Sequence, residues 1–107
     1  MEPFSVYDLE KCVQMRADAE PGTSYTRTLV DKGVAHCAKK LGEEAVEVAI
    51  AAVAEDRSRL IGETADLLYH LFVVLKVRGV SIAEVEAVLG ERTRRTGLDE
   101  KAARKGG

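Results

Sequence analysis

Acidic residues at helical spacing are the groups in this sequence best suited to chemistry. A first group comprises Glu43, Glu44 and Glu47, and a second comprises Glu63, Asp66 and His70. Residues three, four and seven positions apart share one face of a helix, so each group lies on a single face. The flanking stretches 45–54 and 67–75 are almost wholly apolar and contain no proline, which is typical of buried helices. The carboxylates are therefore expected to point inward or into a cleft.

Carboxylates in such surroundings require a partner of opposite charge. An unpaired buried carboxylate costs several kcal/mol, and like charges four residues apart, such as Glu43 and Glu47, repel. No lysine or arginine at helical spacing is expected to offset this cost and repulsion, so a divalent cation is the simplest partner. An all-oxygen ligand set favours Mg²⁺, with Mn²⁺ as a substitute, over Zn²⁺. The alternative is a solvated acidic stripe, or pairing with Arg57, Arg59 or a neighbouring subunit.

A hydroxyl-rich turn at 23–26 precedes a short helix predicted over 25–32. Hydroxyls and backbone N–H groups at a helix N-terminus receive a phosphate well. Simple capping of the helix is the alternative reading of the same hydroxyls. Four bases in this part of the sequence flank the acidic groups and suggest a polyanionic substrate: Arg27, Lys32, Lys39 and Lys40.

Capping and breaking signals predict an all-α fold of about five helices. The first begins after Ser5 and ends at the Pro21-Gly22 break, and the others are predicted over 25–32, 34–54, about 57–78 and from 82 to before Gly97. The short turn near Asp56 makes the third and fourth an antiparallel hairpin, which brings the two acidic groups to one level. Both hairpin helices are expected to be packed nearly all round, and the fifth to bury Val88 and Leu89.

The chain of 107 residues is expected to form one all-α domain over 1–97, followed by a charged, mobile tail over 98–107. Faces this apolar on a short chain favour completion of the core by homodimerisation into a four-helix-bundle-like arrangement. The formal net charge of -2 gives no case for binding nucleic acid or a membrane surface. Cys12 and Cys37 are isolated and predict reduced packing residues in the cytoplasm.

Four segments together resemble the phosphoribosyl-ATP pyrophosphohydrolase family, which performs the second step of histidine biosynthesis. They are Ser24-Tyr25-Thr26, Lys32-Gly33, the run 40–47 (KLGEEAVE) and the run 63–71 (ETADLLYHL). The resemblance covers roughly residues 9–95. It implies hydrolysis of the α–β phosphoanhydride of phosphoribosyl-ATP to phosphoribosyl-AMP and pyrophosphate, with Mg²⁺, a cytoplasmic location and a homodimer.

The resemblance also assigns roles to residues of this sequence. Metal binding falls to Glu44, Glu47, Glu63 and Asp66. Catalysis falls to Glu43, Glu44 and Glu47, with Glu43 as a further ligand or as the base that takes the proton of water. Substrate contacts fall to Ser24, Tyr25, Thr26, Arg27, Lys32, Lys40, Tyr69 and His70. The imidazole of His70 either contacts the nucleotide or orients a carboxylate.

Two other functions remain open from the sequence. One is a house-cleaning pyrophosphohydrolase that uses the same metal site on a free nucleoside triphosphate. The other is a non-catalytic helical dimerisation module, which explains the apolar faces and leaves the clustered carboxylates without a purpose. A di-iron bundle is excluded, since its Glu-x-x-His motif is absent at both His36 and His70.

Overall fold

The protein is all-helical in the part that the computed structural model describes, residues 2–94 and 104. Five helices follow one another along the chain: α1 (Val6–Ala17), α2 (Tyr25–Lys32), α3 (Val34–Ala54), α4 (Arg57–Arg78) and α5 (Ile82–Thr93). The predicted all-α class of about five helices is confirmed in this part of the chain, and α2 and α3 have the predicted bounds. Apart from residue 104, the predicted tail lies outside the described residues.

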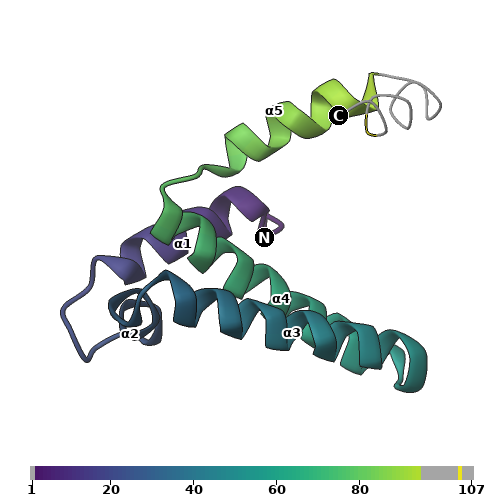
Figure 1. The fold of residues 1–107 in the computed structure, drawn as a ribbon, viewed down its shortest axis with the longest axis horizontal. Coiled ribbons are helices and arrows are strands. Elements are labelled where there is room, and N and C mark those ends of the chain that lie inside the picture. The colour runs from purple at the N-terminus through teal and green to yellow at the C-terminus, as the bar shows by residue number, and fades with distance from the viewer. Residues whose placement is uncertain (1, 95–103, 105–107) are drawn as a thin grey trace.

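The two longest helices, α3 and α4, form an antiparallel hairpin that dominates the molecule (Figure 1). Asp56 caps α4, because its carboxylate accepts the backbone N–H of Arg59 at 2.9 Å. Only two residues separate the helices, so the chain reverses sharply and their side chains face one another at matched levels. No helix in the described part of the chain is long and apolar enough to cross a membrane.

Glycines at positive φ set two further helix junctions, between α2 and α3 and between α4 and α5. Gly33, at φ 94°, ends α2 and leads directly into α3, which turns the chain without an intervening loop. Gly79, at φ 69°, ends α4 in the left-handed conformation, and the Val80 N–H then donates to the Leu75 carbonyl at 2.9 Å. This is a Schellman motif, in which glycine avoids the steric cost of the left-handed region.

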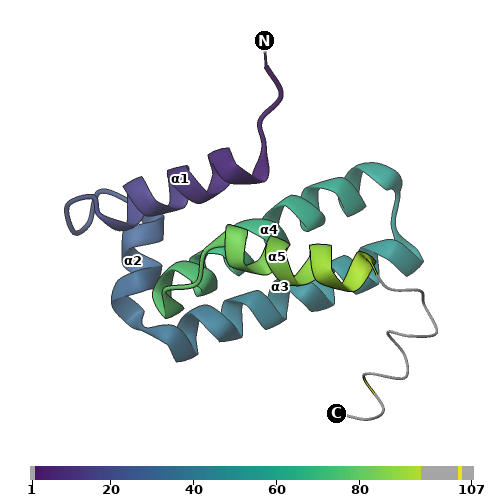
Figure 2. The same cartoon turned by 90° about the horizontal axis from the view of Figure 1, so that it is seen from above.

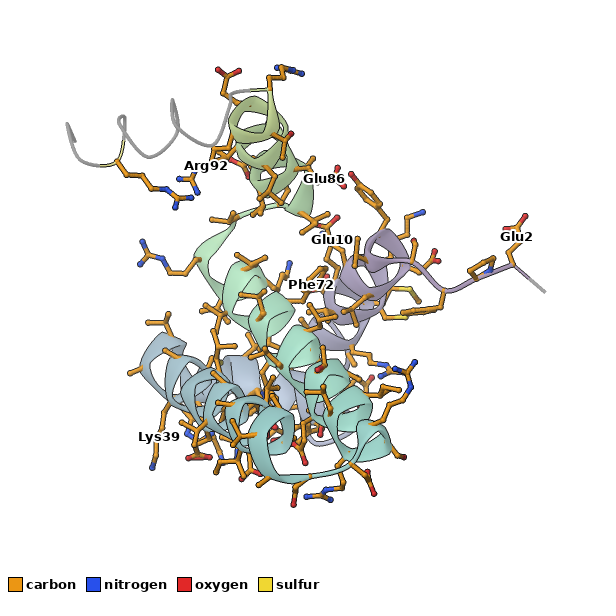
Figure 3. The ribbon with its side chains drawn as sticks, turned by 90° about the vertical axis from the view of Figure 1, so that its right-hand side faces the viewer. Glu2, Glu10, Lys39, Phe72, Glu86 and Arg92 are labelled. Carbon is orange, nitrogen blue, oxygen red and sulfur yellow. The ribbon has the colours of Figure 1, made fainter. Side chains whose placement is uncertain are left out.

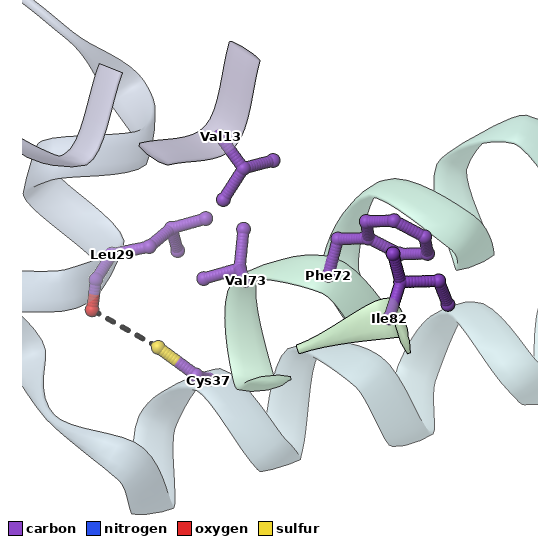
Figure 4. Packing of buried hydrophobic residues seen from close by; sticks show 6 residues of the cluster. All are labelled: Val13, Leu29, Cys37, Phe72, Val73 and Ile82. Atoms are coloured by element: carbon purple, nitrogen blue, oxygen red, sulfur yellow. Dashed lines mark hydrogen bonds between the residues drawn. The ribbon is translucent and has the colours of Figure 1, made fainter. Parts of the chain in front are cut away.

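The core lies where α1, α2 and the start of α3 meet the second half of α4 (Figure 4). Its buried members are Val13, Leu29, Cys37, Phe72, Val73 and Ile82. The Cys37 thiol donates to the Leu29 carbonyl at 3.1 Å, so the polar group of this buried side chain has a hydrogen-bond partner. Cys12 and Cys37 are both free thiols, as predicted.

Helix α5 lies apart from the hairpin and contacts mainly α1 (Figure 1), and seen from above it runs over the hairpin (Figure 2). Its first N–H, from Ile82, donates to the Glu10 carboxylate of α1 at 2.7 Å, in the gap between the two helices (Figure 3). The predicted capping box at Ser81 is present. The prediction that Val88 and Leu89 are buried is wrong within this chain, because α5 packs mainly on α1 and leaves these two side chains about half exposed.

The prediction that α3 is packed nearly all round is also wrong for a single chain. Three large apolar side chains in the second half of α3 are exposed: Val46 (58%), Ile50 (52%) and Val53 (89%). Together with Ala49 and Ala54, they line a shallow apolar hollow of about 350 Å³. Helix α4 covers only the opposite face of α3, and no element of the described chain covers this one.

Candidate active site

The hairpin brings three of the predicted metal ligands together. Glu44 of α3 and Glu63 and Asp66 of α4 each offer a carboxylate oxygen, and these three oxygens lie within 4.8 Å of one another. Glu44 and Glu63 are partly buried and Asp66 is exposed, so the group is open to a ligand from one side. Residues that are 19 or more positions apart in sequence meet here because α3 and α4 run antiparallel.

The negative charges of these three carboxylates repel one another when no cation is bound. Partial burial raises the pKa of Glu63, and the neighbouring Glu47, Glu44 and Asp66 raise it further, against the lowering effect of Arg59. The raised pKa means that the folded chain binds a proton at Glu63 more tightly. The fully ionised cluster is therefore unfavourable. Oxygen-only donors at this separation fit a hard divalent ion such as Mg²⁺, which would draw them closer.

Two basic residues lie at helical spacing from the acids, so the expectation that none would offset them is wrong. The Arg59 guanidinium lies 3.4 Å from Glu63, four residues on, and also 3.4 Å from Glu55. Lys40 lies 3.3 Å from Glu43, three residues on, and this hydrogen bond raises the pKa of Lys40. Both bases are substantially exposed, so they offset the acidic group only in part.

The other two predicted acids lie at the margin of the group. Glu47 is close enough to raise the pKa of Glu63, yet it is exposed and outside the set of three converging oxygens. Glu43 is exposed and paired with Lys40. The predicted roles of Glu43 and Glu47 as metal ligands or catalytic groups stay predictions.

An aromatic cluster adjoins the acids on the side of α2. The rings of Tyr25 and Tyr69 are stacked with centroids 6.4 Å apart, and His70 meets Tyr69 edge-on at 5.0 Å. Burial lowers the pKa of His70, an effect that Glu44 and Asp66 oppose and Lys40 reinforces. The lowered pKa favours the neutral imidazole, which is better suited to orienting a carboxylate than to binding an anion by charge.

The Thr26 hydroxyl is engaged in a hydrogen bond within the protein. Its side chain is 1% exposed, and its Oγ1 lies 2.7 Å from the Tyr69 hydroxyl in a hydrogen bond across 43 residues. Ser24 caps α2 by accepting the Arg27 N–H at 3.2 Å. Both hydroxyls are thus engaged within the protein, one in positioning Tyr69 and the other in starting the helix.

The predicted phosphate-binding bases differ in whether their side chains are already paired within the protein. The Arg27 guanidinium is held by Asp31 at 2.9 Å and by the Ala19 carbonyl at 2.9 Å, which fixes the loop before α2. Lys32 is exposed at the end of α2, and Lys39 points into solvent away from the hairpin (Figure 3). Lys40 is the predicted base that lies beside the acids.

A cleft of about 560 Å³ lies on the far side of the aromatic cluster, between the end of α1 and the start of α2. Its lining includes Met15, Arg16, Ser24, Tyr25, Thr26 and Tyr69. The sequence analysis missed Met15 and Arg16, because nothing in their local pattern distinguishes them from other exposed residues at the end of a helix. Only the packing of α1 against α4 places them beside Tyr69.

Known proteins match this chain over nearly its whole length. Residues 6–93 match the family model for phosphoribosyl-ATP pyrophosphohydrolase. The chain belongs to this family. A protein named phosphoribosyl-ATP pyrophosphatase 1 from Bradyrhizobium diazoefficiens is 58% identical over 98% of this chain and 99% of its own. The phosphoribosyl-ATP pyrophosphatase of Azorhizobium caulinodans is 59% identical over 91% of this chain and 89% of its own.

Family membership confirms the resemblance stated from the four sequence segments. A further relative, phosphoribosyl-ATP pyrophosphatase 1 from Rhodopseudomonas palustris, is 56% identical over 98% of both chains. The matched region contains every residue of the acidic group, the aromatic cluster and the cleft. All three features therefore lie within the part of the chain that defines the family.

Proposed function

We propose that this chain hydrolyses phosphoribosyl-ATP to phosphoribosyl-AMP and pyrophosphate, the second step of histidine biosynthesis. The family match and the names of the relatives support this reaction. The convergence of Glu44, Glu63 and Asp66 from two helices is the observation that carries it, because a polyphosphate requires a cation at its site of cleavage. A hydrolase that cleaves the α–β anhydride needs an attacking water, an acceptor for its proton and charge to stabilise the leaving pyrophosphate.

The residues that would hold Mg²⁺ are Glu44, Glu63 and Asp66, with Glu47 beside Glu63 as a fourth. When bound, the ion supplies Lewis-acid stabilisation of phosphate oxygens and acidifies water. The protein holds its three carboxylates on two rigid helices, so their oxygens are oriented before the ion arrives. His70 is buried and near enough to Glu44 and Asp66 for their charges to raise its pKa, so it would help to keep these carboxylates in place.

Proton transfer and charge neutralisation fall to the rim of the site. Glu43 is proposed as the acceptor of the water proton, since it is exposed and lies one residue from the metal ligand Glu44. Lys40 would then release Glu43 and contact a phosphate oxygen, and Lys32 would contribute a further positive charge. Arg27 would have to break its ion pair with Asp31 to contact a phosphate. Its proposed role is therefore the structural one of fixing the loop before α2.

The reaction is tested by measuring pyrophosphate release from phosphoribosyl-ATP, with and without Mg²⁺, beside ATP and dUTP. Fast release from phosphoribosyl-ATP that requires Mg²⁺ is the expected result. Turnover of ATP or dUTP alone would keep the metal site and replace the substrate with a free nucleoside triphosphate. No pyrophosphate release from any of the three substrates would contradict the proposed enzymatic activity and favour a helical dimerisation module.

A second copy of this chain is proposed as the cover for the exposed face of α3. The hollow lined by Val46, Ile50 and Val53 is almost wholly apolar, and a chain of 107 residues has few other elements to cover it. Pairing of two such hairpins would produce the four-helix-bundle-like core expected from the sequence. Sedimentation equilibrium is expected to give a dimer that Val53→Glu dissociates, and a monomeric wild type would contradict the proposal.

A cytoplasmic location is proposed from the family resemblance. Both cysteines are free thiols, and Cys37 is fully engaged in the core, which suits a reducing compartment. Separation of cell fractions with an antibody to the chain would test the location, with recovery in the soluble cytoplasmic fraction as the expected result.

A further inference from the structure

Arg16 is a base in the lining of the cleft that has no acidic partner among the described residues. Among the lining residues of the cleft that the structure describes, it alone carries a charge. No salt bridge or side-chain hydrogen bond joins Arg16 to the described part of the chain, whereas Arg27, Lys40 and Arg59 are each paired with an acid. A guanidinium that lines a cleft without a partner is suited to bind an anion there.

The position of Arg16 relates the cleft to the acidic group. Arg16 lies close enough to Tyr69 for its charge to lower the pKa of that hydroxyl, against the larger effect of burial. The Tyr69 ring in turn contacts His70, which adjoins Glu44 and Asp66. The aromatic cluster thus separates two sites of opposite character, a metal-binding acidic group on one side and an arginine-bearing cleft on the other.

Phosphoribosyl-ATP has two anionic ends that match these two sites. Its triphosphate is the end that is cleaved, and its ribosyl group carries a separate 5′-phosphate that a free nucleoside triphosphate lacks. We propose that Arg16 binds this 5′-phosphate in the cleft and so distinguishes phosphoribosyl-ATP from ATP. The inference rests on the proposed function and names the residue that gives it substrate specificity.

The shape of the cleft agrees with this assignment. A volume of about 560 Å³ is within the range of pockets that bind small molecules, and it accommodates a sugar phosphate. Tyr25 is largely exposed at the edge of the cleft and stacked on Tyr69, so its free face is available to the purine between the two phosphate ends. The substrate would then extend across the aromatic cluster from Arg16 to the acids.

The test compares binding of phosphoribosyl-AMP with binding of AMP by isothermal titration calorimetry. Wild type is expected to prefer phosphoribosyl-AMP, and Arg16→Gln is expected to reduce this preference by about 10- to 100-fold, the usual effect of a lost charge-assisted hydrogen bond. Arg16→Lys should retain part of the preference. Arg78→Gln is the matched control, since Arg78 is exposed at the end of α4 and does not line the cleft.

Two outcomes would overturn the inference. One is an Arg16→Gln protein, folded by circular dichroism, that keeps the wild-type preference. The other is a wild type that binds AMP and phosphoribosyl-AMP equally while it releases pyrophosphate from phosphoribosyl-ATP, which leaves the proposed function intact. Failure of the wild type to release pyrophosphate would instead contradict the proposed function itself.

Discussion

Replacement of Thr26 by valine separates the positioning role of this residue from the substrate contact expected from the sequence. Valine keeps the shape and the β-branch of threonine and removes only the hydroxyl. That hydroxyl is 2.7 Å from the Tyr69 hydroxyl, in a residue that is 1% exposed. If Thr26 serves to hold Tyr69 against α2, Thr26→Val should lower stability as well as activity.

The size of the effect follows from how each partner is buried. Loss of a typical intramolecular hydrogen bond costs about 0.5–1.5 kcal/mol, and an orphaned buried hydroxyl costs about 1–3 kcal/mol. Tyr69 lines the cleft, so water can replace Thr26 as its partner, and the lower part of the range applies. We expect a loss of about 1 kcal/mol, equivalent to a fall in Tm of about 4 °C or more for a domain of this size.

The assay is thermal unfolding followed by circular dichroism at fixed protein concentration, since an oligomer has a concentration-dependent Tm. Thr28→Val is the control, because Thr28 is an exposed residue of the same helix whose hydroxyl donates only to the Ser24 carbonyl. Its stability should change by less than about 0.5 kcal/mol. The double variant with Tyr69→Phe should be more stable than the sum of the single changes indicates, with a coupling of about 1 kcal/mol.

A spectroscopic readout accompanies this measurement. Burial raises the pKa of Tyr69, and the hydrogen bond from Thr26 partly offsets the rise. Thr26→Val removes the offset, so Tyr69 should ionise at a still higher pH in an alkaline absorbance titration. An unchanged Tm together with a large rise in KM would refute the reasoning, because it would make Thr26 a substrate contact with no part in positioning Tyr69.

Further predictions follow from the core and the caps. Cys37 should react with Ellman's reagent only as the protein unfolds, because burial raises the pKa of its thiol and its S–H donates a hydrogen bond. Cys12 should react in the native state, and equal reaction rates of the two thiols would contradict this prediction. Leu29→Ala should cost about 2–5 kcal/mol in denaturant unfolding, since Leu29 is fully buried, and a loss below about 1 kcal/mol would show that the core is elsewhere. Hydrogen bonds from Ser81 lower the pKa of Glu84, so NMR titration should find this carboxylate ionised to a lower pH than an unpaired glutamate, and Ser81→Ala should raise its pKa. The capping stabilisation is thus present above the ordinary glutamate pKa and lost as the pH falls through the lowered one.

Sequence patterns predicted the helices well because their boundaries depend on neighbouring residues. Ser24, Gly33, Asp56 and Gly79 each act within one turn of the helix that they start or stop, so their effect is visible in the sequence. The convergence of acids followed from the same logic, because a two-residue turn leaves an antiparallel hairpin as the only outcome.

Features that depend on distant residues were predicted poorly. The position of α5, which leaves Val88 and Leu89 exposed, depends on its packing against α1, where the Ile82 N–H donates to the Glu10 carboxylate across 72 residues. The cleft likewise depends on how α1 packs against α4, which no local pattern around Arg16 reveals. The ion pair between Arg59 and Glu63 is different, since its four-residue spacing is visible in the sequence, where pairing with Arg59 was the alternative to a metal site.

The central claim is that Glu44, Glu63 and Asp66 bind the metal ion on which hydrolysis depends. The most direct test is to measure Mn²⁺ binding by electron paramagnetic resonance, and Mg²⁺-dependent pyrophosphate release, on Asp66→Asn. Glu86→Gln is the control, since Glu86 is an exposed acid on α5 away from the hairpin (Figure 3). The account predicts that Asp66→Asn stays folded, binds Mn²⁺ at least about 10-fold more weakly and loses about 100-fold or more in turnover. Wild-type affinity and turnover in Asp66→Asn would contradict it.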